Sequence, residues 1–317
     1  ALYAEGLARR LAEDPQLRSW AKEVLAGSDS VSTGSSYGKL LGRDSLLAKS
    51  PWATTLTDER EEEQKLARFL LATDRATTTD QLLKRLSDLQ GTDGLWSWYP
   101  GMKGSLYTTE YVLRILLRLS ASEGLEQALR LRLSSMIRRG IGALNTQAVK
   151  DLALIQKAKR EKKVFIPHTG LDYLYLSALT KEQKLQSLSA EEERAERYFL
   201  SQLRGEAHRL PLDSKPRAAV ALLLAGDKAL AKDLAESLRQ HLKEDETGLF
   251  FARLQSEAYS WLDRSLPALV ETIELFSRLR PLDTEHIDGM KRWIIAQKRT
   301  TAWSSDLLSA EAIHALT

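Results

Sequence analysis

Carboxylate side chains are the residues of this sequence with the clearest capacity for chemistry, and five of them lie in or beside apolar segments: Asp93, Glu110, Glu271, Asp306 and Glu311. A glycoside hydrolase needs two carboxyl groups about 5–9.5 Å apart across the sugar, one of them with a raised pKa. However, Glu110, Glu271 and Glu311 occupy equivalent positions of a repeated pattern, in TTEYV, LVETI and SAEAI. We interpret a residue that recurs with the fold as structural. The sequence therefore predicts no catalytic residue. If the protein were instead an enzyme that acts on polysaccharide, Asp93 and Glu110 would be the least implausible acid/base pair.

Other kinds of reactive or metal-binding site are not indicated. The sequence has no cysteine, which excludes disulfides, thiolate metal sites and a cysteine nucleophile within it. Its five histidines show no metal-ligand spacing. The pattern Gly-x-Ser-x-Gly occurs at Gly34–Gly38, but within the predicted surface loop and not at the strand-to-helix turn that a hydrolase nucleophile needs. No glycine-rich phosphate loop follows a strand, because no clear strand is predicted. We expect no enzymatic activity, no metal and no cofactor.

Aromatic residues recur with a fixed spacing in loops that precede apolar helices. Gln90 is followed six residues later by Trp96, and Gln297 is followed six residues later by Trp303. Such internal similarity is typical of repeat architectures. The simplest interpretation of these two tryptophans is burial at the ends of the helical layers, since burial of such a side chain contributes roughly 1.5–3 kcal/mol or more.

Two aromatic residues of the first loop, Trp98 and Tyr99, are not repeated. They are better candidates for an exposed contact surface, which would favour a protein or glycan partner. The predicted contact residues of these loops are Asp93, Trp96, Trp98, Tyr99, Trp261 and Trp303.

Two kinds of predicted helix alternate along the chain, and apolar residues follow the 3, 4 and 7 spacing of helices throughout. Helices that are apolar on most faces must be buried, whereas helices with one apolar stripe cover them and face water. The first kind is predicted at residues 112–119, 171–179, 218–225, 266–276 and 307–316. The second kind carries the stripes Leu125–Leu129–Leu133–Met136, Leu230–Leu234–Leu238–Leu242 and Ile287–Met290–Trp293–Ile294.

This alternation predicts an all-α fold, an α/α toroid of two concentric helical layers like those of terpenoid cyclases and thioester domains. A tetratricopeptide-like solenoid is the competitor, but it would repeat about every 34 residues. The apolar helices begin about 40 to 64 residues apart instead. In a toroid, every loop that leads into an inner helix lies at the same end, so a functional surface is expected there.

We predict a single toroid domain over residues 1–317, with a surface loop at residues 28–38 and a capping box at Ser189 and Glu192. Ala1 lies partway into a predicted helix, so we expect the chain to be a piece of a larger multidomain protein. The charges are nearly balanced, with 46 basic and 43 acidic residues. The one basic tract, residues 150–163, lacks interleaved aromatic residues and is predicted to be a solvated helix face. Neither nucleic-acid binding nor membrane contact is expected.

Four segments resemble the thioester-type helical domain of bacterial α2-macroglobulins, closest to the large forms of Bacteroidetes-like bacteria. They are SPWATTLTDEREEEQKLARFL, LQGTDGLWSWYPGMKGSLYTTEYVL, HTGLDYLYLSAL and MKRWIIAQKRTTAWSSDLLSAEAIHAL. The most specific part is the DG-x-WSW-x-PG motif followed by a Tyr-Thr-Thr helix. The resemblance runs over nearly the whole chain in the order of the family.

The resemblance implies a periplasmic, cell-surface or secreted protein that entraps proteases. In that family a protease cleaves a bait region, the molecule rearranges, and a Cys–Gln thioester can couple to the attacker. This sequence departs from the pattern, because it contains no cysteine and therefore no thioester motif. Its start, ALYAEGLARRL, resembles the helix shortly after that motif, so the motif either lay upstream of Ala1 or was never present.

The expected function is that of a helical domain of a protease inhibitor. Its partners would be proteases and the neighbouring β-rich domains of the same parent chain. Two alternatives remain open: a toroid enzyme that acts on polysaccharide, and an interaction scaffold with no protease involved.

Overall fold

The computed structural model describes residues 14–30, 64–65, 67–68, 71, 75–122, 125–252, 264–281, 283–300 and 306–316. The chain divides into two compact units. The small unit comprises Ala1–Asp88 and Ser122–Gln127, and the large unit comprises Leu89–Ala121 and Ala128–Thr317. The single domain expected over residues 1–317 stays a prediction.

The small unit contains the helices α2 (Pro15–Ser30) and α5 (Arg75–Asp88). Asp14 caps α2, because its carboxylate accepts hydrogen bonds from the backbone N–H groups of Gln16 and Leu17 at 2.8 and 3.3 Å. The predicted surface loop at residues 28–38 is wrong at its start, since α2 continues through Ser30. The rest of that loop lies outside the described residues.

The large unit consists mainly of helices at the positions that the apolar pattern predicts. The capping box at Ser189 is confirmed, since its hydroxyl accepts from the N–H of Glu192 and its own N–H donates to the Glu192 carboxylate. The helices are α6 (Leu106–Ala121), α7 (Gln127–Arg160), α8 (Leu171–Glu182), α9 (Ala190–Glu206), α10 (Lys215–Leu224), α11 (Lys228–His241), α12 (Ser265–Leu279), α13 (Thr284–Thr300) and α14 (Asp306–Leu316).

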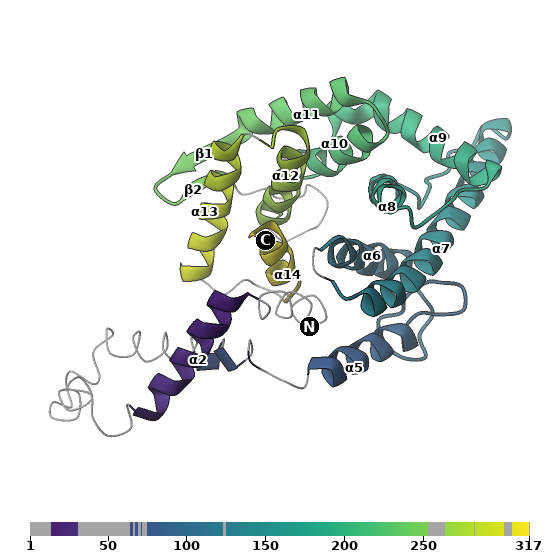
Figure 1. Cartoon of the computed structure of the whole chain (residues 1–317). Coiled ribbons are helices and arrows are strands. Elements are labelled where there is room, and N and C mark those ends of the chain that lie inside the picture. The colour runs from purple at the N-terminus through teal and green to yellow at the C-terminus, as the bar shows by residue number, and fades with distance from the viewer. Residues whose placement is uncertain are drawn as a thin grey trace, which may run out of the picture. The chain divides into compact units, whose positions relative to one another are not determined.

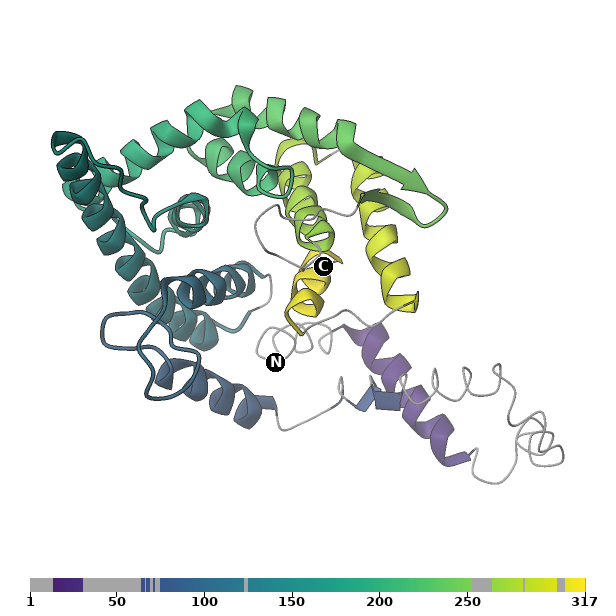
Figure 2. The ribbon, with the colours of Figure 1, turned by 180° about the vertical axis from the view of Figure 1, so that it is seen from behind.

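Within the large unit the helices that are apolar nearly all round lie inside, and each contacts the next. The contacts run from α6 to α8, α10, α12 and α14, while α7, α9, α11 and α13 lie on the outside (Figures 1 and 2). The helix α10 shows why: all seven residues from Pro216 to Leu222 are buried. A helix with no polar face is stable in water only when other helices surround it.

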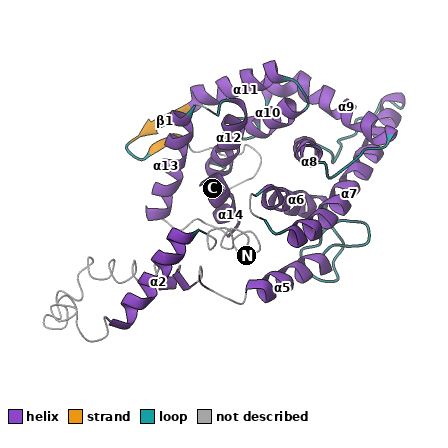
Figure 3. Cartoon of the chain, viewed as in Figure 1, coloured by secondary structure: helices purple, strands orange, loops and turns teal. Residues whose placement is uncertain are grey.

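One departure from the predicted helices is a hairpin of two short strands, β1 (Leu242–Asp245) and β2 (Gly248–Phe251), beside α13 (Figure 3). Leu242, predicted as the last residue of a helical stripe, lies in β1 and pairs with Phe251. Gly248 has a φ of 135°, and a Cβ there would come within 2.3 Å of the Gly289 carbonyl oxygen of α13. Only glycine fits this conformation and this close approach, which allows β2 to pack against α13.

No helix among the described residues combines the length and the hydropathy that crossing a membrane requires.

Candidate functional site

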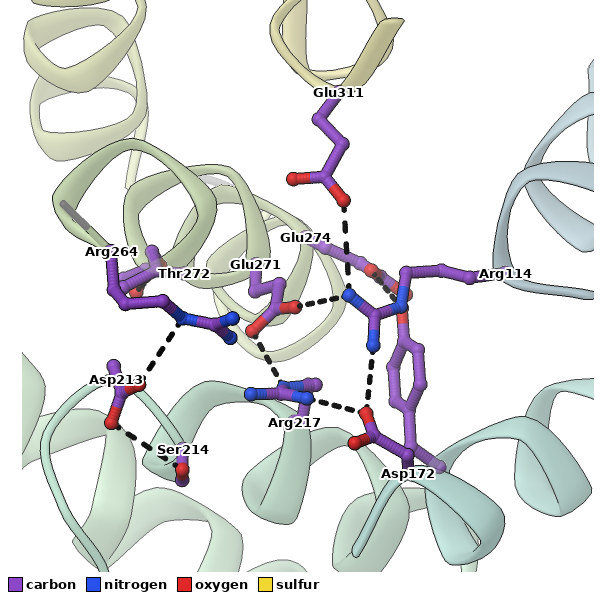
Figure 4. Close-up of polar contacts among 12 residues, drawn as sticks. Arg114, Asp172, Asp213, Ser214, Arg217, Arg264, Glu271, Thr272, Glu274 and Glu311 are labelled. Atoms are coloured by element: carbon purple, nitrogen blue, oxygen red, sulfur yellow. Dashed lines mark hydrogen bonds and ion pairs between the residues drawn. The ribbon is translucent and has the colours of Figure 1, made fainter. Parts of the chain in front are cut away.

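Buried arginine side chains link the inner helices of the large unit. Arg114 and Arg118 of α6 and Arg217 of α10 are 8%, 4% and 6% exposed. Four carboxylates surround them, from Asp172 of α8, Glu271 and Glu274 of α12 and Glu311 of α14 (Figure 4). We call these seven residues the arginine cluster.

Arg114 contacts carboxylates on more helices than the other two arginines of the cluster. Its Nη2 lies 2.7 Å from Asp172 Oδ1, and its Nη1 lies 3.5 Å from Glu271 Oε1 and 3.8 Å from Glu311 Oε1. A single guanidinium on α6 therefore pairs with carboxylates of α8, α12 and α14. The first and last inner helices in the sequence are joined by this side chain.

Arg217 pairs with two of the carboxylates that Arg114 contacts, those of Asp172 and Glu271. It donates a hydrogen bond to Asp172, and its Nε lies 3.0 Å from Glu271 Oε2. Burial alone would raise the pKa of Asp172, but the charges of Arg217 and Arg114 outweigh it and hold that pKa below its usual range. The Asp172 carboxylate is therefore ionised at neutral pH and serves as a charge partner.

The second layer of the cluster lies nearer the C-terminal ends of the helices. Arg118 approaches Glu274 and Glu311, each at 3.7 Å, and Tyr175 donates to Glu274 at 2.7 Å. Burial lowers the pKa of His314 to about 4, and the positive charge of Arg118 adds to this effect. This histidine is therefore neutral at pH 7. Beside this layer opens a cleft of about 630 Å³ whose lining includes Arg118 and His314.

Glu110 differs from its counterparts in the repeat. Glu271 and Glu311 pair with arginines, as a structural role requires, whereas Glu110 forms no ion pair or hydrogen bond with any described residue. Burial raises the pKa of Glu110 to about 7, and the negative charge of Asp172 adds to the rise. A carboxyl group that is half protonated near neutral pH can donate a proton.

The second part of the site is the aromatic loop, residues 91–105, which precedes α6. Trp96 lies fully buried at its centre, and its backbone N–H donates to the Thr109 hydroxyl at 2.9 Å. The Gln90 side chain donates to the carbonyl groups of Gly94 and Met136, both at 3.0 Å. The repeated Gln and Trp thus fasten the loop to α6 and α7. Trp96 is not available for a partner contact, which corrects its inclusion among the contact residues.

Four large side chains that follow Trp96 in the sequence are exposed to solvent instead. Trp98 and Tyr99 are 61% and 68% exposed, and Met102 and Tyr107 are exposed as well. Among the described residues, these four make up nearly half of the exposed large hydrophobic side chains, within ten positions of the sequence. We call Trp98, Tyr99, Met102 and Tyr107 the aromatic surface.

Asp93 stabilises the turn of the same loop. Its carboxylate accepts a hydrogen bond from the backbone N–H of Leu95 at 3.1 Å, and its side chain is exposed. Trp261 and Trp303 lie outside the described residues, so their predicted contacts stay predictions. Asp306 begins α14.

Sequence reasoning missed the arginines, although a signal was present. In LRILLRL of α6 and PRAAVALLL of α10, arginine stands within a helix that is otherwise apolar. A charge on a helix that must be buried needs a buried partner, so these arginines pointed to carboxylates on neighbouring helices. Among the described residues, no group of three or more histidine or acidic side chains is placed to hold a metal ion.

No protein-family model matches this sequence, and a comparison with curated proteins gives no match. The resemblance to α2-macroglobulins therefore remains a hypothesis that rests on the motifs of the sequence.

Proposed function

We propose that this chain is a non-catalytic helical domain of an α2-macroglobulin-like protease inhibitor. In this proposal the aromatic surface contacts a neighbouring domain or the captured protease. The inner and outer helices would form an α/α toroid, an arrangement that the succession of contacts from α6 to α14 supports. The protein would act in the periplasm, at the cell surface or outside the cell.

The aromatic surface is the observation that carries the proposal. Its side chains are exposed, yet the loop that holds them is fixed by the buried Trp96 and by hydrogen bonds to α6 and α7. Exposed aromatic side chains on an ordered backbone are favourable for binding, because little conformational entropy is lost on contact. Aromatic residues are also enriched among those that dominate binding energy in protein interfaces.

The arginine cluster supports a non-catalytic role for most of the buried carboxylates. Asp172, Glu271 and Glu311 all lie within 4 Å of arginine nitrogens. Asp172, which the charges of Arg217 and Arg114 hold ionised, is a poor proton donor. The cluster is better suited to hold the inner helices together.

A suitable experiment uses the whole protein that contains this chain, incubated with a panel of proteases. An enclosed protease should lose activity on a large protein substrate and keep activity on a small peptide. We expect the double variant Trp98→Ala/Tyr99→Ala to retain about tenfold less protease, because the contact area is removed. The control is Leu131→Ala, an equally exposed apolar side chain of α7, which should leave retention unchanged. If the unaltered protein restrains no protease of the panel, the proposal is wrong.

Glu110 favours a second candidate, a hydrolase that acts on polysaccharide. Its raised pKa suits a general acid, and Asp172, with its lowered pKa, suits the second carboxylate. Asp93, the partner expected from the sequence, instead stabilises its own loop. Glycan hydrolysis that is lost in Glu110→Gln, with unchanged thermal unfolding, would establish this candidate and overturn the first.

A further inference from the structure

We propose that residues 163–167, between α7 and α8, bind an extended strand of a partner protein that carries acidic side chains. An apolar side chain of that strand would enter the cleft beside the segment. The inference does not rest on the proposed function, because it concerns a different surface and no protease.

The segment has the alternation of a β-strand without a strand beside it. Val164 and Ile166 are 93% and 81% exposed, whereas Phe165 and Pro167 between and after them are half-buried; Phe165 and Pro167 line the cleft, and Val164 lies at its edge. Side chains of an extended chain point alternately to opposite sides. One side of the segment therefore packs on the protein, and the other presents β-branched side chains to solvent.

The backbone of the segment is anchored at both ends and open between them. The N–H of Lys163 donates to the Ala158 carbonyl at 2.9 Å, and the N–H of Thr169 donates to the Asp151 carboxylate at 2.7 Å. From residue 164 to residue 168, no backbone group forms a hydrogen bond with any described residue. Backbone groups that have no partner in an exposed segment are available to pair with an added strand.

Residues of this segment line an apolar cleft of about 520 Å³. Leu174 of α8 and Phe199 and Leu203 of α9 contribute buried side chains to its walls, and Phe165 also lines it. The cleft can receive a leucine or phenylalanine side chain of the added strand. Strand pairing would supply affinity, and this cleft would select the side chain that enters it.

The charge around the segment identifies the partner as acidic. Residues 157–163 hold one acidic residue, Glu161, which pairs with Lys157 and Lys163, and five cations in all: Lys157, Lys159, Arg160, Lys162 and Lys163. Lys159 and Lys163 lie on the edge of the cleft, and Glu206 is the acidic side chain in its lining. A strand with glutamate residues beside its apolar side chain would complement this field. Nucleic acid is less suited, because the exposed side chains of the segment are aliphatic and cannot stack on bases.

The experiment measures binding of a fluorescein-labelled peptide, Glu-Thr-Val-Thr-Phe-Thr-Val-Thr-Glu, by anisotropy. Two matched peptides are compared with it: one with lysine in place of glutamate, and one N-methylated at alternate residues so that it cannot pair as a strand. We expect saturable binding of the first peptide and at least tenfold weaker binding of the other two. Hydrogen exchange of the amides at residues 164–166 and 168 should slow at least tenfold when the first peptide is bound.

The matched protein variants are Val164→Asp/Ile166→Asp and Leu131→Asp, which place acidic groups at exposed apolar positions inside and outside the segment. The first should weaken peptide binding at least tenfold, and the second should leave it unchanged. The proposal is overturned if the acidic peptide does not bind, if the lysine or N-methylated peptide binds equally well, or if amide exchange in the segment is unaffected. Preferential binding of a labelled oligouridylate would also overturn it. A failed protease-retention experiment has no bearing on these outcomes.

Discussion

The arginine cluster and the aromatic loop are the two chemically distinctive regions of the large unit, and they use polar contacts in opposite ways. In the arginine cluster, side chains from five helices meet, and each guanidinium is shared between carboxylates of different helices (Figure 4). In the aromatic loop, most hydrogen bonds join groups less than fifteen residues apart, and they serve to hold the backbone.

The difference indicates that separate regions of this fold provide stability and partner contact. The cluster encloses its charges, so its energy depends on all partners being present together. The loop buries Trp96 and exposes Trp98, so the side chain that fixes the loop is distinct from the side chains that can meet a partner. Changes in the cluster should therefore affect stability, and changes in the aromatic surface should affect binding.

The largest expected effect comes from Arg217→Ala, which removes one partner from both Asp172 and Glu271. Loss of one member of a buried ion pair costs about 3–5 kcal/mol, and here Asp172 and Glu271 would keep Arg114 as their remaining cationic partner, so we expect the lower end of this range. Urea unfolding followed by tryptophan fluorescence measures this change. The matched control, Arg204→Ala, removes an exposed pair with Asp227 and should cost about 1 kcal/mol or less. Similar values for the two variants would mean that the cluster does not hold the inner helices together.

A smaller effect is expected where α7 packs on the aromatic loop. A Cβ at Gly140 would lie 2.6 Å from Cζ3 of the buried Trp96, whereas a Cβ at Gly142 would have no atom within 4 Å. Gly140→Ala should therefore destabilise the protein by about 1–3 kcal/mol through overpacking. Gly142→Ala should stabilise it by about 0.5–1 kcal/mol, because alanine is the better helix residue. Thermal unfolding of the two variants, which differ only by position, tests the packing; equal shifts would contradict it.

The next expected effect is the pH dependence caused by Glu110. Its pKa is raised from 4.5 to about 7 in the folded protein, mainly by burial. The folded state thus binds this proton more tightly, so the stabilisation is complete below pH 4.5 and is lost as the pH rises through 7. Glu110→Gln should match the unaltered protein at pH 4.5 and exceed its stability by about 1–2 kcal/mol at pH 8, allowing for partial exposure. Urea midpoints across this range measure it, and a constant difference would refute the assignment.

His314 should cause a pH dependence of stability with the opposite sign. Its pKa falls from 6.5 to about 4 on folding, mainly because it is buried. Its contribution is therefore complete above pH 6.5 and is lost as the pH falls through 4. His314→Gln should reduce the loss of stability over that interval, which distinguishes it from Glu110→Gln in the same unfolding series.

Much of the secondary structure could be predicted, because helical spacing is a local property of the sequence. The apolar pattern of α10 and the capping box of α9 both led to the observed helices. The hairpin of β1 and β2 could not be predicted in this way. Its strands are only four residues long, and its turn depends on the close approach of Gly248 to α13.

The sequence by itself determined which helices are buried, and it singled out Trp96 as a residue that recurs with the fold. These follow from spacing along one helix and from repetition. Only the tertiary structure decided the charge pairing, since the Asp172 and Glu271 partners of Arg114 lie 58 and 157 residues further along the chain. It also decided that Trp98 and Val164 face solvent, because exposure depends on what the rest of the chain covers. Burial of a charge is stable only with its partners in place, and only folding brings them together.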